Sequence, residues 1–175
     1  MALRKKLIIE RANKNDMDTI ADFIRSSADW YRPFLAEKDL NEHYVDDEWK
    51  EKNYTKREFY LGKDKENGEV GTISLQYFGD YAYLGYIYLD SRHVGKGYGL
   101  ELINFAKETC LQKNKKGMCL IAHPQAKWAI KAYEKYGFKK KFSKKEEILN
   151  WNNGFLRPYY EEGFDLYVYD LHESL

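Results

Sequence analysis

The sequence predicts an α/β (α+β) fold in one domain spanning residues 1–175, with a mixed, mostly antiparallel central sheet flanked by helices. Three observations support this. Short β-rich runs and amphipathic stretches follow each other along the chain. Three consecutive strands within residues 58–89 are separated by tight turns, which is typical of an antiparallel meander. A strand, a helix and a strand then follow around residues 98–122, which indicates one parallel crossover.

The N-terminal part is expected to hold one strand and one helix. The strand covers residues 7–11, and Asn15 or Asp16 can cap the helix that follows. Apolar residues recur at helical spacing from Met17 to Ile24, so this helix should bury one face. Residues 29–48 contain seven acidic and two basic residues among several aromatic ones. We interpret them as a broken or second helix with an acidic, aromatic surface.

The meander and the C-terminal half follow from turn and helix signals. Strands are expected at 58–62, 70–78 and 81–89, with turns at Asn67-Gly68 and at Gly79-Asp80. A helix beginning after Gly99 should end by Gly117, and a second helix, residues 126–136, should end at Gly137. Further strands are predicted at 118–122, from Phe138 and at 164–169. The connection 143–163 is longer than a hairpin loop, so it is either functional or a local elaboration.

Composition excludes several classes of protein. The 29 basic and 28 acidic residues give a net charge of +1, which does not favour a nucleic-acid partner. Cys110 and Cys119 lack the paired spacing of a zinc site, so we expect two buried thiols and no metal. Neither a signal peptide nor an apolar run of about 18 residues is present, so we expect a cytoplasmic protein without a membrane partner.

The most specific feature is a glycine cluster, Gly95-Lys96-Gly97-Tyr98-Gly99, between a strand and a helix. Alternate glycines allow positive φ and close backbone approach, and the helix N-terminus offers unpaired amides to an anion. Together they suit phosphate. The residues after Lys96 do not fit a P-loop, and the third glycine of a dinucleotide fingerprint is missing. A glycine-rich turn without a ligand is the alternative.

Residues 89–99, LDSRHVGKGYG, resemble motif A of the GNAT superfamily of acyl-CoA-dependent N-acyltransferases, a loop that binds the pyrophosphate of acetyl-CoA. Residues 126–138, AKWAIKAYEKYGF, resemble a second motif of that family. The resemblance covers nearly the whole chain and is strongest over residues 70–140, the expected acyl-CoA-binding core. It implies a GNAT-like fold, acetyl-CoA as cosubstrate and no metal.

The resemblance also implies site residues. The expected cofactor-binding residues are Ile87, Tyr88, Leu89, Val94, Gly95, Lys96, Gly97, Tyr98, Gly99, Leu100, Ala126 and Tyr133. The backbone N–H of Leu89 would stabilise charge on the thioester oxygen. Tyr133 would be the catalytic acid that protonates the leaving thiolate, although its place on the apolar helix face also fits a core tyrosine.

Three positions depart from the family pattern. Val94 stands where the family has Gln or Arg, with Arg92 two residues earlier, and Ala126 stands where it has Asn. The strand 81–89 contains no carboxylate, although many members place a Glu there as general base. The proton acceptor therefore stays open. A carboxylate reached through water, Tyr86, Tyr88 and His123 are the candidates.

The expected function is transfer of an acetyl group from acetyl-CoA to a primary amine of a small, polyamine-like molecule or of a peptide. Residues 29–50 and 143–163 are the expected acceptor-site elements, and carboxylates near aromatic rings there would suit a cationic amine. A solvated helix face is the alternative for the first of them. Six lysines could steer the cofactor's phosphates, and a solvated charged face is the alternative for them: Lys113, Lys115, Lys116, Lys139, Lys140 and Lys141.

Two other functions remain open at this point. One is a GNAT-fold domain that binds acyl-CoA as a sensor or scaffold without catalysis. The other is an acetyltransferase that acts on a protein N-terminus or lysine, which an open acceptor groove would favour. The sequence does not determine the oligomeric state, and a homodimer is one of the states that it allows.

Overall fold

The computed structural model describes residues 5–35, 37 and 44–171 of the chain. It contains a seven-stranded sheet with the hydrogen-bonded order β1-β2-β3-β4-β5-β7-β6. The residues form two compact units, one of residues up to 76 together with 85–106, and one of residues 77–84 together with 107 onward. Strands β3 and β4 and helix α4 pass from one unit to the other along the chain. The predicted fold class, a mostly antiparallel sheet with helices, is confirmed.

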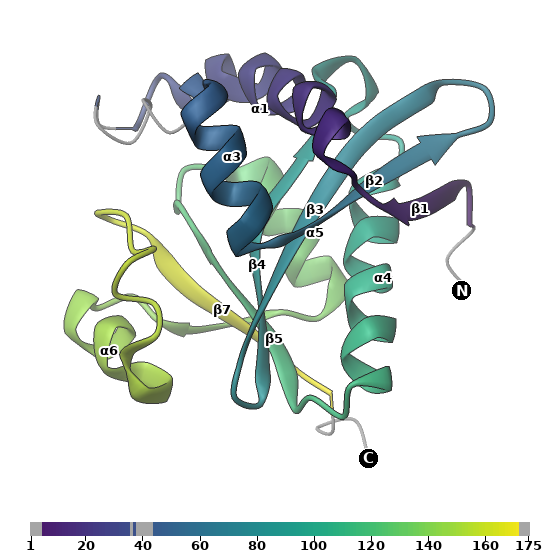
Figure 1. Ribbon diagram of the computed structural model, residues 1–175. Coiled ribbons are helices and arrows are strands. Elements are labelled where there is room, and N and C mark those ends of the chain that lie inside the picture. Colours follow the sequence, from purple (N-terminus) through teal and green to yellow (C-terminus); the bar gives the residue numbers. More distant parts are fainter. Residues whose placement is uncertain (1–4, 36, 38–43, 172–175) are drawn as a thin grey trace. The chain divides into compact units, whose positions relative to one another are not determined.

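The first unit contains β1, α1, α3 and β2 with parts of β3, β4 and α4. Their bounds are β1 Leu7–Arg11, α1 Met17–Tyr31, α3 Asp47–Lys56, β2 Glu58–Asp64, β3 Gly68–Phe78, β4 Tyr81–Leu89 and α4 Tyr98–Gln112. Strand β2 pairs antiparallel with both β1 and β3, as the predicted meander requires. Gly68, at the predicted Asn-Gly turn, has φ +71°, which a glycine adopts without strain. The β2–β3 hairpin is visible in Figure 1.

Helix α1 buries the stripe that its sequence predicts, from Met17 to Ile24. Asp16, one of the two predicted residues, occupies the N-cap position of α1, but its side chain makes no capping hydrogen bond to that helix. Asn13 accepts a hydrogen bond from the Asp16 amide, and the Asp16 carboxylate accepts one from the Asn13 amide, which forms a capping box. A 3₁₀ turn, Lys14–Asp16, then leads into the helix. The side chain of each residue, Asn13 and Asp16, accepts a hydrogen bond from the amide of the other, so the helical segment begins with this turn, earlier than expected.

For residues 29–48 we expected a broken or second helix, and the described part of this segment contains the end of one helix and the start of another. Helix α1 ends at Tyr31, and α3 begins only at Asp47, where Asp46 caps it through the Trp49 amide. Residues 36 and 38–43 lie outside the described part. Helix α3 lacks an apolar stripe, and Asn53 is its one buried residue, so periodicity could not find it. Helices α1 and α3 lie side by side and are linked by a 2.7 Å ion pair from Lys50 to Asp18 (Figure 1).

The second unit contains the remaining elements. Their bounds are β5 Gly117–Ala122, α5 Lys127–Tyr136, β6 Lys139–Phe142, α6 Lys145–Asn150 and β7 Asp165–Asp170. Strands β4 and β5 are parallel, which confirms the crossover, and β7 pairs antiparallel with β5 and β6. Gly117 is not the stop of α4, because it lies in β5. The chain leaves the helix at Asn114, which adopts φ +56°.

The connection 143–163 is a local elaboration with a core of its own. It contains α6 and a 3₁₀ turn, Trp151–Gly154, and it buries Ile148 and Leu156 fully. Aromatic rings from this connection pack on β3 and β4 residues. The pairs are Phe155 with Phe78 at 4.5 Å, Trp151 with Tyr81 at 4.9 Å and Tyr159 with Tyr83 at 5.1 Å between ring centroids. Burial of apolar surface therefore explains the length of this segment.

Two further expectations can be checked. Cys110 and Cys119 are buried free thiols, and burial raises the pKa of Cys110 to about 11, so neither is a reactive thiolate. Within the described residues, none of the helices has the length and apolar character that crossing a membrane requires.

Candidate active site

The C-terminal end of β4 contains three predicted site residues, Ile87, Tyr88 and Leu89, all half-buried. Gly71 on β3 permits a close approach here. A Cβ at that position would lie 2.6 Å from Leu89 Cδ2 and 2.9 Å from the Tyr88 carbonyl oxygen. The Ser27 hydroxyl of α1 donates a hydrogen bond to the Leu89 carbonyl at 3.4 Å. Both β3 and α1 thus hold the strand end, and Gly71 is a contributor that sequence reasoning missed.

The glycine cluster forms an open loop at the start of α4. Gly95 and Gly97 have φ of +89° and +88°, and no heavy atom lies within 4 Å of the Cβ position at either residue. Gly99 is the second residue of α4 and has no positive φ, so only two of the three glycines need the left-handed region. The first amide of the helix with a described acceptor is that of Glu101, 3.4 Å from the Gly97 carbonyl. The amides before it are available to an anion.

The loop's cationic side chains are exposed. Val94 and Lys96 point into solvent, and Lys96 Nζ lies 3.1 Å from His93 Nδ1. Arg92 is folded back onto Asp90, to which its Nε and Nη2 donate at 3.0 and 2.9 Å. The hydrogen bond from Arg92 lowers the pKa of the Asp90 carboxyl to about 2. Arg92 therefore shapes the turn before the loop through Asp90.

Tyr98, the first residue of α4, anchors the glycine loop through its buried side chain. It is 2% exposed, and its hydroxyl donates to Asp64 Oδ2 at 2.7 Å while accepting from Asn67 Nδ2 at 2.9 Å. Asp64 is the last residue of β2 and Asn67 lies in the turn before β3, so a hairpin more than thirty residues away supports the glycine loop. This bond lowers the pKa of Asp64 and raises that of Tyr98. Leu100, the last predicted loop residue, is half-buried in the first turn of α4.

The second motif lies in the second unit. Ala126 is buried at the N-cap of α5 and provides no side-chain cap. Tyr133 is half-buried in the middle of that helix, with its ring 6.0 Å from Phe138. His123 follows β5, and its Nδ1 accepts a hydrogen bond from the Gln125 amide at 3.1 Å. This nitrogen is already used in a turn, which makes His123 a weaker candidate for a proton relay.

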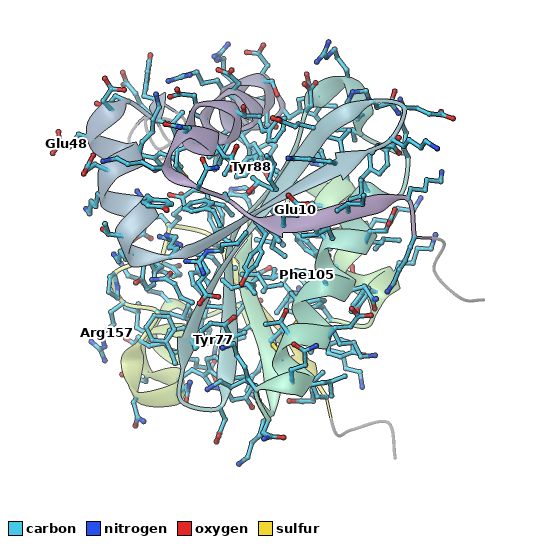
Figure 2. All side chains as sticks on the ribbon, turned by 45° about the vertical axis from the view of Figure 1, so that its right-hand side comes forward. Glu10, Glu48, Tyr77, Tyr88, Phe105 and Arg157 are labelled. Carbon is cyan, nitrogen blue, oxygen red and sulfur yellow. The ribbon has the colours of Figure 1, made fainter. Side chains whose placement is uncertain are left out.

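Tyr86 and Tyr88 lie on one face of β4, with ring centroids 6.2 Å apart. Tyr88, labelled in Figure 2, lies 6.4 Å from Tyr31 of α1. Tyr86 lies 5.4 Å from Trp49 of α3, whose Nε1 donates to the Tyr86 hydroxyl at 3.2 Å. The two tyrosines therefore face the helices that follow β1 and precede β2.

Several of the acidic residues expected near an acceptor amine have partners of their own. The pairs are Asp29 with Arg32, Asp47 with Lys50, and Glu162 with Lys145, while Asp46 caps α3. Glu48 projects from α3 into solvent (Figure 2). Asp39 and Glu42 lie outside the described residues. The negative charge of these segments is thus partly neutralised within the chain.

The lysines considered for phosphate steering also have local contacts. Lys113 and Lys115 lie over the Tyr77 ring, at 4.9 and 5.7 Å from its centroid. Lys116 pairs with Asp80 at 3.4 Å. Within residues 5–35, 37 and 44–171, no group of three or more His, Cys, Asp or Glu could hold a metal ion.

The glycine loop combines open Cβ positions and positive φ with the N-terminus of a helix, an arrangement that suits an anion. The acetyltransferase (GNAT) family matches residues 23–138, two thirds of the chain. The chain belongs to the GNAT family. GNAT members use acetyl-CoA as the acyl donor, so this chain is an acetyl-CoA-dependent N-acyltransferase.

Solved structures of other GNAT proteins show the same fold. The PaiA N-acetyltransferase of Thermoplasma acidophilum, in complex with coenzyme A, has a TM-score of 0.74 at 18% identity, over 95% of this chain and 99% of that one. A GNAT acetyltransferase of Staphylococcus aureus Mu50 has 0.71 at 18% identity, over 94% and 99%. A chimera of the Vibrio cholerae spermidine N-acetyltransferase SpeG and hSSAT has 0.63 at 17%, over 95% and 96%. No curated protein matches the sequence significantly.

Proposed function

We propose that this GNAT protein transfers an acetyl group directly from acetyl-CoA to a primary amine of a small, polyamine-like molecule or of a peptide. The observation that carries the proposal is the open glycine loop, in which Gly95 and Gly97 take positive φ directly before the N-terminus of α4. Residues 1–175 would then act as one N-acetyltransferase domain. Similar solved structures include a spermidine N-acetyltransferase and an N-acetylglutamate synthase, so the fold itself accommodates different amines.

In this proposal the loop amides bind the pyrophosphate, and the end of β4 binds the pantetheine arm. The Leu89 N–H would donate to the thioester oxygen as negative charge develops there. Tyr133 would give its phenolic proton to the departing thiolate. Ala126 cannot supply the side-chain amide that the family often has at this position. Backbone groups at the start of α5 would therefore bind the cosubstrate in place of that side chain.

The acceptor is proposed to be cationic. Residues 29–50 and the connection 143–163 contain an excess of carboxylates close to aromatic rings. A cation gains free energy from both kinds of group. Intramolecular pairs such as Glu162 with Lys145 reduce this gain. We therefore expect a modest preference for amines with more than one positive charge.

One screen tests this proposal. Purified protein and acetyl-CoA are incubated with polyamines, amino acids, neutral amines, lysine-containing peptides and peptide N-termini, and the released thiol is measured. Transfer to a polycationic amine, with a KM that rises with ionic strength, is the expected result, because salt screens exposed charges. Preference for a neutral or acidic amine would contradict the charge argument alone. Transfer only to protein or peptide acceptors would favour the protein acetyltransferase alternative. Coenzyme A binding without any transfer would contradict the proposal.

A further inference from the structure

A buried guanidinium lies in the sheet of the first unit. Arg57, which follows α3, is 8% exposed, and its Nε donates to Asn53 Oδ1 at 3.0 Å. Asn53 is held in turn, because its Nδ2 donates to the Trp49 carbonyl at 3.0 Å. Gly85, in the middle of β4, provides the space: a Cβ there would overlap Arg57 Nη1 and would lie 3.2 Å from Ser74 Oγ. Burying a cation costs free energy. The space at Gly85 and the hydrogen bond from Arg57 to Asn53 therefore suggest that the buried guanidinium has a role.

The guanidinium lies against the ring of Tyr86. Arg57 Cζ is 4.7 Å from the centroid of that ring, and the hydroxyl of the same ring accepts the Trp49 Nε1 hydrogen bond at 3.2 Å. The ring also stacks on Phe59 at 6.0 Å, in the core of this unit. The Tyr86 amide donates to Ser74 Oγ at 2.9 Å, which fixes its place in the strand. A positive charge beside the ring and an N–H aimed at the oxygen both favour a phenolate over a phenol.

Tyr86 also lies where the proposed reaction needs a proton acceptor. The strand β4 contains no carboxylate, and Tyr86 precedes Leu89 by three residues, about 10 Å along the strand. The Tyr86 hydroxyl accepts its hydrogen bond from Trp49, which belongs to the expected acceptor-site element 29–50, and a bound water can link this hydroxyl to an acceptor ammonium. The described contacts of the Tyr86 ring include one charged group, the Arg57 guanidinium, and a second titratable ring, that of Tyr88. The chemistry and the position therefore point to the same residue.

We propose that Tyr86 takes the proton from the acceptor ammonium and that Arg57 is the positioning residue that maintains Tyr86 as a base. The inference rests on the proposed acetyl transfer. The ammonium loses one proton to the Tyr86 phenolate, and the nitrogen lone pair forms a bond to the thioester carbon. The C–S bond breaks with its electron pair on sulfur, and the thiolate takes the proton of Tyr133. The nitrogen loses its second proton as the amide forms, and through bound water this proton replaces the one that Tyr133 gave to the thiolate. Tyr86 releases its proton to solvent.

The first test is an ultraviolet titration of phenolate in the wild type and in Tyr86→Phe. The difference between the two curves reports Tyr86 alone among the 16 tyrosines. We expect its midpoint below the ordinary tyrosine value of about 10. The midpoint should move upward in Arg57→Gln, which keeps a polar group of similar reach, and also in Trp49→Phe. A Tyr86 midpoint at or above the ordinary value would overturn the proposal.

The second test is the pH dependence of kcat/KM with the best amine of the wild type. Tyr86→Phe should lower kcat/KM by on the order of 10²–10³ near neutral pH. The loss should shrink as the pH approaches the pKa of the free amine, about 10, because solution then supplies the deprotonated nucleophile. Arg57→Gln should move the acidic limb of the profile to higher pH. A merely structural role would lower the rate equally at all pH values.

The matched control is Tyr54→Phe, which removes a hydroxyl from α3 beside the same core cluster. It should leave the pH profile and the Tyr86 titration unchanged. A wild type that binds coenzyme A and transfers no acetyl group refutes the proposed function, and the inference with it. A wild type that transfers acetyl groups as fast as its folded Tyr86→Phe variant refutes only the inference.

Discussion

Gly97→Ala isolates the backbone strain of the glycine loop from side-chain bulk. At φ +88° an alanine is strained, and no neighbouring heavy atom lies within 4 Å of its Cβ, so the substitution adds strain without a clash. An L-residue in left-handed backbone costs about 1–2 kcal/mol. If the free loop relaxes to avoid this cost, coenzyme A must restore it on binding. That corresponds to a dissociation constant about 5–30-fold higher.

Gly79→Ala is the matched control. Gly79 has φ +59° and also has no heavy atom within 4 Å of its Cβ position, but it lies in the turn between β3 and β4. Urea unfolding should show a smaller loss of stability for Gly97→Ala than for Gly79→Ala, because the free loop can relax whereas the paired strands β3 and β4 hold the turn at Gly79. Calorimetry with coenzyme A should show weaker binding for Gly97→Ala alone. Wild-type affinity in a folded Gly97→Ala protein, or equal weakening in both variants, would refute the phosphate-loop assignment.

Three further predictions concern single side chains. Tyr133→Phe keeps the ring and should lower kcat by on the order of 10²–10⁴ with little change in coenzyme A affinity; unchanged turnover would leave Tyr133 a core residue. Tyr98→Phe removes the bonds to Asp64 and Asn67 and should lower both the melting temperature and the coenzyme A affinity, and a loss of neither would show that the hairpin does not support the loop. The pKa of Asp90 lies at about 2 in the folded protein against an ordinary 3.8, so its contribution to stability is present above about pH 4 and is lost as the pH falls toward 2. The difference in unfolding free energy between wild type and Asp90→Asn should shrink over that interval, and a constant difference would contradict the Asp90–Arg92 pairing.

Local pattern was sufficient for most of the fold. Alternation and turn residues located the meander, because the Asn67-Gly68 turn and its flanking strands are encoded within about twenty residues. The glycine loop was equally visible, since its requirement for positive φ is a property of the residues themselves. Helix α3 escaped notice because Asn53 is its one buried residue, and the end of α4 was misplaced because Asn114 took the role expected of Gly117.

The supports of the candidate site were visible only in the tertiary structure. Arg57 lies beside Tyr86 and beneath Gly85 because α3 leads into β2, and Tyr98 meets Asp64 because a helix start lies against a distant hairpin. No periodicity marks such pairs, because the partners are separated by 28 to 34 residues and are joined only once the strands have paired. Backbone conformation is a local property that residue types reveal. A buried charge and its partner depend on strand register, which the whole sheet determines.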